Sequence, residues 1–158
     1  MKFFQKITIQ IVLYEEDKEM VFNCLKRLKN FKIVILDNSG NHNLKNEVLK
    51  NFNIESYIVE KKNLGYSKGH NKASSFVGTE YLLILNADCD IDETNINNLL
   101  IAHEKYKDCA ITAPTTYDKE MKTSYNGGLL PENGYKDSIT LIDGDTCFES
   151  VLGSAMLI

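Results

Sequence analysis

Strand-like segments alternate with helical segments through the first two thirds of the chain. Residues 7–13, 33–36, 55–59 and 81–85 are rich in β-branched and other apolar side chains, and the last of these segments is the most apolar. Continuous apolarity is typical of strands that helices cover on both faces. The repeated strand–helix order predicts βαβ units, so we expect an α/β fold with an open, mostly parallel sheet between helices.

Four helices and a fifth strand complete this expectation. Apolar residues recur at helical spacing around residues 20–28, 44–52 and 93–107, and the segment 66–77 favours a helix entered through Asn63-Leu64-Gly65. Residues 110–115 are expected to form the fifth strand. After Pro114, turn formers at 126–128 and 131–134 separate short strand-like pieces at 138–142 and 147–152, which indicates a small antiparallel addition near the C-terminus.

The length, charge and hydropathy of the chain limit its number of domains, its partners and its location. A chain of 158 residues can bury one sizeable core, so residues 1–158 are expected to form a single domain. The net charge of −4 argues against nucleic acid as a partner, because proteins that bind it usually carry a basic surface. No apolar run approaches the roughly 18 residues that cross a bilayer, and the N-terminus lacks a signal-peptide core. We therefore expect a cytoplasmic protein.

The cysteines and the C-terminus carry two further expectations. Cys24, Cys89, Cys109 and Cys147 lack the close pairs of zinc and redox motifs, so we expect reduced and mostly buried thiols. Residues 151–158 are apolar to the last position, whereas free termini are usually polar. This composition suggests a truncated chain.

Polar residues that directly follow strands point to a ligand site. Ligands of open α/β sheets bind beyond the carboxyl ends of the strands, near the point where strand order reverses. Three polar segments occupy such positions: Tyr14-Glu15-Glu16-Asp17, Asp37-Asn38-Ser39 and Asn86-Ala87-Asp88-Cys89-Asp90. We expect the site where these three segments meet.

The third segment predicts a metal–diphosphate site. Asp88 and Asp90 are two residues apart, and in an extended segment both carboxylates would point the same way. Carboxylates crowded at a strand end suit Mg²⁺ or Mn²⁺ that bridges phosphates. An alternative is that Asp88, Asp90 and Asp92 only cap the following helix. A calcium-binding EF-hand is excluded, because Glu93 and Leu99 stand where that loop requires glycine and glutamate.

The first two segments suggest a site for a base. Asp37 could accept the imide N–H of uracil or thymine, and Tyr14 could supply a face for the base. Two alternatives stay open, since Asp37 also fits an Asx turn and Tyr14 also fits a strand-end residue with its hydroxyl in water.

Residues 63–71 place small side chains and amide groups at a helix entrance, which suits phosphate oxygens. The segment lacks the Gly-Lys-Ser/Thr ending of a P-loop and the third glycine of a dinucleotide fingerprint. His70, which lies in this segment, is interpreted as a structural histidine.

The order of these motifs resembles family 2 glycosyltransferases of GT-A fold, and within them the rhamnosyltransferase-type branch. The resemblance rests on Asp-Asn-Ser after the second strand, Asn-x-Gly-Tyr with a following Asn, Asn-Ala-Asp after the apolar strand, a later proline, and the segment 153–158, Gly-Ser-Ala-Met-Leu-Ile. It covers about residues 7–158. It implies a Rossmann-like GT-A domain that transfers a sugar, with inversion, from a UDP- or dTDP-linked donor to a glycan or lipid-linked acceptor.

The resemblance also implies roles for individual residues. Asn86-Ala87-Asp88 matches the family's DxD element with asparagine in place of the first aspartate. Asp88 is then a ligand of Mg²⁺ or Mn²⁺, and Asp90 is a further contact at the metal or the ribose. Gly153 and Ser154 match the segment beneath the donor sugar. The residues implied to face the nucleotide are Tyr14, Glu15, Asp37, Gly65, Asn71, Asn86 and Asp88.

The acceptor side of the family's active site has no counterpart in this sequence. The family's acidic motif, which supplies the general base, would follow the Gly-Ser-Ala segment, and the sequence stops at Ile158. Asp143 and Asp145 precede that segment and match no known base, so no base is assigned. Acceptors in the family are often lipid-linked, which implies contact with the inner face of the membrane.

Three other functions are alternatives to sugar transfer. The chain could be a nucleotide-sugar-binding fragment or module without transfer activity. A nucleotidylyltransferase is disfavoured because its glycine-rich, basic loop is absent between Ile7 and Lys18. A phosphatase with an aspartyl nucleophile would use Asp88 and Asp90, but the downstream lysine and acidic pair are not in the expected order.

Overall fold

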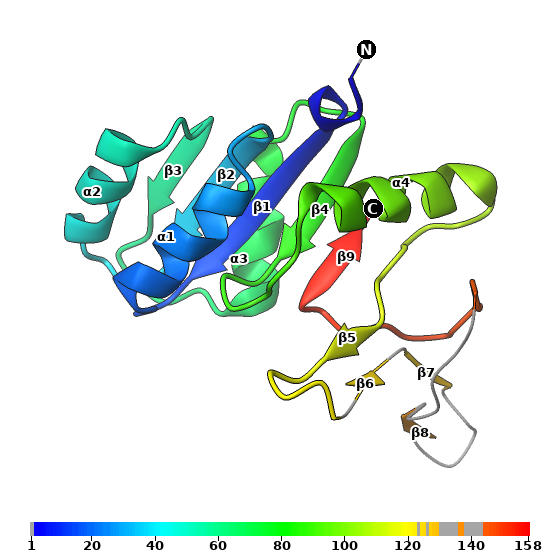
Figure 1. Ribbon diagram of the computed structural model, residues 1–158. Helices are drawn as coiled ribbons and strands as arrows, with labels where there is room; N and C mark the ends of the chain where they lie inside the picture. The colour runs from blue at the N-terminus through cyan, green and yellow to red at the C-terminus, as the bar shows by residue number, and fades with distance from the viewer. Residues whose placement is uncertain (1, 123, 126, 130–135, 138–143) are drawn as a thin grey trace.

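The computed structural model describes residues 2–122, 124–125, 127–129, 136–137 and 144–158, and every structural statement below refers to these residues. Its centre is a five-stranded sheet with the order β3-β2-β1-β4-β9 (Figure 1). The strands are β1 (Ile7–Leu13), β2 (Lys32–Asp37), β3 (Ser56–Val59), β4 (Tyr81–Leu85) and β9 (Ala155–Leu157). The first four are parallel and β9 runs antiparallel to β4. The expected α/β fold with a mostly parallel sheet is confirmed.

Helices cover both faces of this sheet. They are α1 (Lys18–Arg27), α2 (Asn43–Asn51), α3 (Tyr66–Ala73) and α4 (Glu93–Lys105), with short 3₁₀ helices at Phe3–Gln5 and Ser74–Phe76. One core joins β1 to side chains of α1, α2 and α4, and a second joins β2 to Ala73 of α3. Figure 1 accordingly shows α1 and α4 in front of the sheet and α3 behind it.

The burial of the central strand β1 explains why the strand segments do not alternate between apolar and exposed polar residues. Its odd-numbered residues, from Ile7 to Leu13, belong to the core under α1 and α4, while Thr8 and Gln10 on the opposite face are also buried. Both polar side chains have partners, since the hydroxyl of Thr8 lies 2.7 Å from that of Thr79 and Gln10 bonds to His70. The amide nitrogen of Gln10 and the hydroxyl of Thr8 are thus paired, as is usual for buried polar groups, whereas Oε1 of Gln10 has no partner among the described residues.

The expected strand at residues 110–115 is wrong. Only Thr112 pairs with the sheet, in an isolated antiparallel bridge to Leu157. β9 occupies the position beside β4, so the 110–115 segment reaches only the outer edge of β9. Pro114 lacks a backbone N–H and cannot extend the ladder, and the next strand, β5 (Thr116–Tyr117), belongs to a different sheet.

The antiparallel addition is confirmed in outline. β5 pairs with β6 (Ser124–Tyr125), and β7 (Gly128–Leu129) pairs with β8 (Lys136–Asp137). The expected strand at 138–142 and the turn at 131–134 lie outside the described residues. Residues 147–152 form no strand, and only Ser150 makes a bridge, to Gly128.

The thiols and the surface complete the description. All four cysteines are free, but only Cys24 is buried and Cys147 is exposed, so the expectation of mostly buried thiols is wrong.

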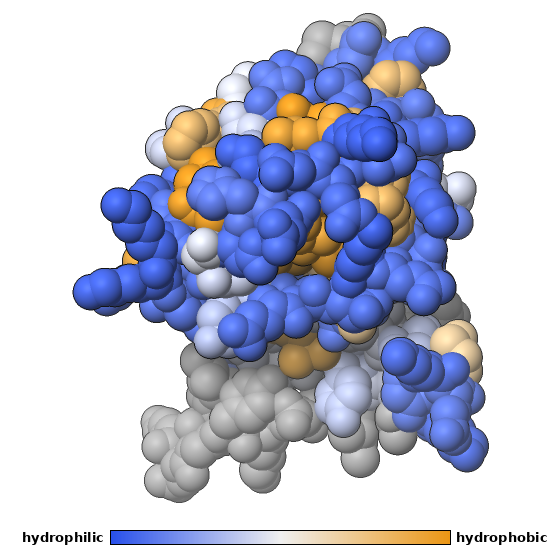
Figure 2. Space-filling view, turned by 90° about the vertical axis from the view of Figure 1, so that its left-hand side faces the viewer, coloured by the Kyte–Doolittle hydropathy of each residue, from blue (hydrophilic) through white to orange (hydrophobic). Residues whose placement is uncertain are grey.

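The apolar residues Ala155 and Leu157 are buried in β9. None of the helices in the described residues is long and apolar enough to cross a bilayer. On the face shown in Figure 2, hydrophilic side chains predominate and hydrophobic ones appear in patches between them.

Candidate functional site

The carboxyl ends of β2, β1 and β4 lie side by side at one edge of the sheet. β1 is the central strand of the three, because the chain first adds β2 and β3 on one side of it and then returns to add β4 on the other. This reversal of strand order is the position where open α/β sheets bind ligands. The three polar segments expected to form the site therefore follow three neighbouring strands.

Asp37 ends β2 and is buried, with 1% of its surface exposed. Its Oδ1 accepts a hydrogen bond from the backbone N–H of Ser39 at 2.8 Å, so the Asx turn is present. Its Oδ2 accepts a hydrogen bond from the hydroxyl of Tyr57, on β3, at 2.9 Å. Each carboxylate oxygen retains a lone pair, so these two contacts leave Asp37 able to accept a further donor.

A cavity of about 300 Å³ opens beside Asp37. It is lined by Leu13, Glu15, Glu16, Asp37, Ser39, Asn41 and Leu44. This volume is at the lower end of the range for small-molecule sites. These lining residues, all in the described part of the chain, include three carboxylates and no lysine or arginine, so an anionic ligand group would be repelled unless a cation accompanied it.

The loop after β1 forms one wall of this cavity. Glu15 has a φ of 62°, in the left-handed region that non-glycine residues seldom adopt. The backbone N–H of Tyr14 donates a hydrogen bond to the carboxylate of Glu16. Burial raises the pKa of Glu16, and the negative charges of Asp37 and Asp88 raise it further. Tyr14 itself is 48% exposed and is not among the lining residues.

The entrance to α3 is tied to the end of β2. Asn38 is buried and its side-chain oxygen accepts a hydrogen bond from the N–H of Leu64 at 3.2 Å. Gly65 has a φ of +74°, which explains glycine at this turn. Asn71 is exposed on α3, and in the described part of the chain no hydrogen bond joins its side chain to another predicted site residue.

His70 lies inside this helix and is buried. Its Nδ1 is 2.7 Å from Nε2 of Gln10, and the same amide donates to the carbonyl oxygen of His70 at 2.8 Å. Burial lowers the pKa of His70 to about 4. The imidazole is therefore neutral near pH 7, which agrees with the interpretation of a structural histidine.

Gly153 and Ser154 lie against the loop after β4. The carbonyl oxygen of Ser154 accepts hydrogen bonds from the N–H of Asn86 at 2.9 Å and from the thiol of Cys89 at 3.4 Å. The hydroxyl of Tyr66, the first residue of α3, donates to the carbonyl oxygen of Gly153. The structure thus brings the segment matched to the donor sugar beside Asn86 and the α3 entrance.

The aspartates after β4, Asp88, Asp90 and Asp92, make contacts with different parts of the structure. The backbone N–H of Cys89 bonds to the carbonyl of Asn86 and closes a turn, so the segment is not extended as the sequence suggested. Asp92 caps α4 by accepting from the N–H of Asn95 at 2.8 Å. Asp90 instead lies 3.2 Å from Nε of Arg27, on α1.

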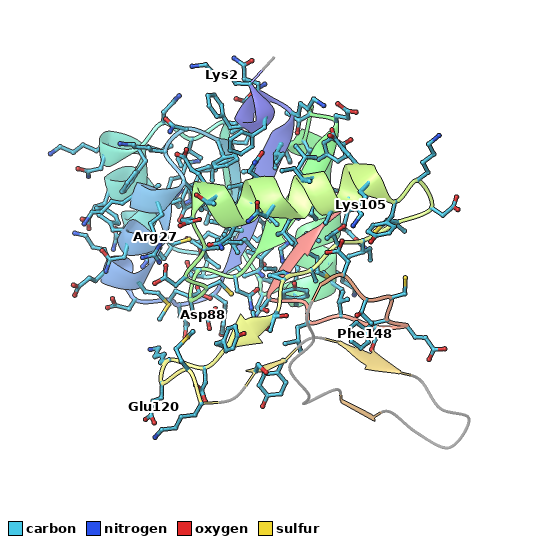
Figure 3. The ribbon with its side chains drawn as sticks, turned by 45° about the vertical axis from the view of Figure 1, so that its right-hand side comes forward. Lys2, Arg27, Asp88, Lys105, Glu120 and Phe148 are labelled. Carbon is cyan, nitrogen blue, oxygen red and sulfur yellow. The ribbon has the colours of Figure 1, made fainter. Side chains whose placement is uncertain are left out.

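Among the three aspartates after β4, Asp88 is the one that forms neither an ion pair nor a helix cap within the described residues. It is exposed at the lower edge of the sheet in Figure 3, and its nearest recorded partner is the thiol of Cys89 at 3.9 Å. In the described residues no group of three or more His, Cys, Asp or Glu side chains could hold a metal ion. A single free carboxylate suits Mg²⁺ or Mn²⁺ that takes its other ligands from phosphates and water, so Asp88 fits a cation shared with a diphosphate.

Sequence reasoning missed three contacts at this edge. Tyr57 bonds to Asp37, and Tyr66 and Cys89 bond to the 153–154 segment. No local pattern marks these side chains, because each contact depends on strand pairing. Asp143 lies outside the described residues, and Asp145 forms an ion pair with Lys105 at 3.0 Å.

Comparison with known proteins agrees with this architecture. The model of the family described as "Glycosyl transferase family 2" matches residues 8–155. Among solved structures, S. aureus TarS 1–349 superposes with a TM-score of 0.52 and 15% identity, over 82% of this chain and 43% of that one. The same TarS fragment in complex with UDP-GlcNAc gives a TM-score of 0.53 and 16% identity, over 81% and 41%. No curated protein matches the sequence.

The likeness to TarS is one of fold, and it confirms the expected GT-A architecture. The chain spans about two fifths of the length of the TarS chains that it matches.

Proposed function

The chain belongs to glycosyl transferase family 2, and we propose that it binds a UDP- or dTDP-linked sugar at the carboxyl edge of its sheet. The sugar would pass to a glycan or a lipid-linked acceptor, with inversion at the anomeric carbon. A lipid-linked acceptor would bring the protein to the inner face of the membrane. The complex of TarS with UDP-GlcNAc supports a nucleotide-sugar donor.

The observation that carries this proposal is the buried carboxylate of Asp37 on the wall of the 300 Å³ cavity. A buried carboxylate with free lone pairs is suited to an N–H donor of a ligand. Uracil and thymine both present such a donor in their imide group. Glu15 lines the same cavity, where it would face the nucleoside.

The diphosphate would lie toward Asn86 and Asp88, beyond β4. Asp88 would hold Mg²⁺ or Mn²⁺, which when bound neutralises charge on the departing nucleoside diphosphate. Asn86 donates its N–H to Ser154 and so keeps the 153–154 segment beside that position. Asp90 is engaged with Arg27, and its role at the metal stays a prediction.

Inversion would follow from a single displacement, in which the acceptor hydroxyl attacks the anomeric carbon opposite the diphosphate. The attack needs a general base that removes the hydroxyl proton. Asp145 is a poor choice for this role, because it is paired with Lys105 and also accepts from the hydroxyl of Tyr106. In this proposal the described residues would bind the donor, and no general base is assigned among them.

Calorimetric titration with UDP and dTDP, in Mn²⁺ and in a chelator, tests the proposal. The wild-type chain should bind at least one nucleotide more tightly with Mn²⁺, and Asp88→Ala should weaken that binding by at least about tenfold. Asp92→Asn is the matched control, because asparagine caps helices as well as aspartate does. Absence of nucleotide binding, or an Asp88→Ala variant that binds like the wild type, would contradict the proposal.

A binding module without transfer activity is the second candidate. It is favoured by the ion pair of Asp145 with Lys105, which makes this carboxylate a poor general base. Tight nucleotide binding without release of UDP or dTDP from the nucleotide sugar, in the presence of glycan acceptors, would support this candidate.

A further inference from the structure

We propose that Tyr57 is a positioning residue that fixes the carboxylate of Asp37 and so makes the site select uracil or thymine over cytosine. This role rests on the proposed function, because it refines how the same cavity would recognise its nucleotide.

The contact between the two side chains is built into the sheet. Tyr57 is 7% exposed and lies on β3, beside the strand that ends in Asp37. Its backbone carbonyl accepts a hydrogen bond from Nζ of Lys45, on α2, at 2.9 Å. Burial raises the pKa of the Tyr57 hydroxyl, and the charge of Asp37 raises it further. The hydroxyl therefore stays protonated and donates to the carboxylate.

Two donors hold the carboxylate from both sides. The N–H of Ser39 bonds to Oδ1 at 2.8 Å and the hydroxyl of Tyr57 bonds to Oδ2 at 2.9 Å. The terminal torsion of an aspartate is otherwise broad. With both oxygens engaged, the plane of the carboxylate is fixed, and its remaining lone pairs keep one orientation toward the cavity.

A fixed acceptor discriminates between pyrimidines. Uracil and thymine carry an N–H at ring position 3, which would donate to Asp37, whereas cytosine carries an acceptor there. Two acceptors that face each other leave both groups without a donor. In a buried site such a mismatch greatly weakens binding of the ligand. Removing the Tyr57 hydroxyl would let the carboxylate rotate and would reduce this selectivity.

The test compares UDP and CDP binding, by calorimetry with Mn²⁺, in the wild type and in Tyr57→Phe. The wild type should prefer UDP, and Tyr57→Phe should lose about tenfold in UDP affinity, the size of one hydrogen bond to a charged group, with CDP changed by less than twofold. Tyr106→Phe is the matched control, since it removes an exposed hydroxyl that bonds to Asp145, and its UDP/CDP ratio should equal that of the wild type.

The outcomes separate the two proposals. A wild-type chain that binds neither nucleotide overturns both the proposed function and this role. An unchanged UDP/CDP ratio in a Tyr57→Phe variant that binds UDP overturns only the role of Tyr57, as does an equal loss for both nucleotides. If Tyr57→Phe does not fold, NMR of the wild type decides, because UDP but not CDP should shift the Tyr57 ring and Ser39 amide signals. Equal shifts would overturn the role.

Discussion

The hydroxyl of Tyr66 donates a hydrogen bond to the carbonyl oxygen of Gly153, although 87 residues separate them in the sequence. A Cβ atom added to Gly153 would lie 3.1 Å from that hydroxyl oxygen and 3.5 Å from the ring carbon that carries it. The first residue of α3 therefore holds the 153–154 segment against the edge of the sheet, and the approach is too close for a larger residue to enter without displacement.

Gly153→Ala and Tyr66→Phe should therefore be energetically coupled. Gly153→Ala should lower the free energy of unfolding by about 1 kcal/mol, because the new methyl group crowds the hydroxyl. In the Tyr66→Phe background the hydroxyl is absent and the nearest atom lies at an ordinary contact distance, so the same substitution should cost clearly less. Denaturant unfolding of the two single variants and the double variant measures the coupling.

Additive effects of these two substitutions would show that the contact between Tyr66 and Gly153 does not limit the position of the segment. Gly144→Ala offers a comparison, since no other atom lies within 4 Å of its added Cβ and its cost would come from its φ of +85° alone. That cost should be the same with and without the Tyr66 hydroxyl.

The parallel strands of the sheet could be predicted because each one is a continuous run of mainly apolar residues in the sequence. The limits of β1 and β4 agree with the apolar runs at 7–13 and 81–85. The strand at 110–115 failed for the converse reason. β9 comes from the far end of the chain and takes the place beside β4, and this pairing depends on contacts that no local pattern contains.

The meeting of the three polar segments at one edge of the sheet was predictable, and the contacts within that edge were not. Parallel strands bring their carboxyl ends to one edge, so Asp37 and Asp88 could be assigned to the same edge of the sheet from their sequence positions alone. The bond from Tyr57 to Asp37 depends on the pairing of β3 with β2. The separation of Asp88 from Asp90 depends on a turn at Asn86 and on Arg27, which belongs to another helix.

Asp92 should matter for stability and not for nucleotide binding. It caps α4 through the N–H of Asn95, so Asp92→Ala should lower the free energy of unfolding by about 1 kcal/mol, whereas Asp92→Asn should retain most of it. Thermal unfolding of both variants checks the difference, and UDP titration with Mn²⁺ should give the wild-type affinity for both. Weakened UDP binding in Asp92→Asn would assign Asp92 to the site.

Arg27 should limit the affinity of Asp88 and Asp90 for divalent cations. Its guanidinium lies 3.2 Å from Asp90 and offsets one negative charge there. Arg27→Gln should therefore raise the affinity for Mn²⁺, by a factor of about 2 to 5, because exposed ion pairs of this kind are worth only about 0.2–1 kcal/mol. Mn²⁺ titration followed by paramagnetic broadening measures the change, with Lys26→Gln on the same helix as the control. Lower Mn²⁺ affinity in Arg27→Gln would contradict this role.

Glu16 should make the chain less stable as the pH rises. Its pKa in the folded state is raised above the ordinary value of 4.5, chiefly by burial and then by Asp37 and Asp88. The folded state then binds the proton more tightly than the unfolded state, so stability falls as the pH rises from 4.5 through the folded pKa. Glu16→Gln should be more stable than the wild type at pH 7, and this difference should vanish near pH 4. A constant difference across that range would show that Glu16 is not responsible.

His70 should produce the opposite dependence in the acidic range. Burial lowers its pKa from 6.5 to about 4, so between these values the unfolded chain binds a proton that the folded chain does not. The free energy of unfolding should therefore decrease as the pH falls from 6.5 to 4, by about 3 kcal/mol at most. His70→Asn should lack this decrease, because the asparagine oxygen can accept from Gln10 as Nδ1 does and does not titrate. Exposed His42 supplies the control, since His42→Asn should keep the decrease of the wild type. Urea unfolding at several pH values measures all three chains, and a decrease that persists in His70→Asn would place its origin in other groups.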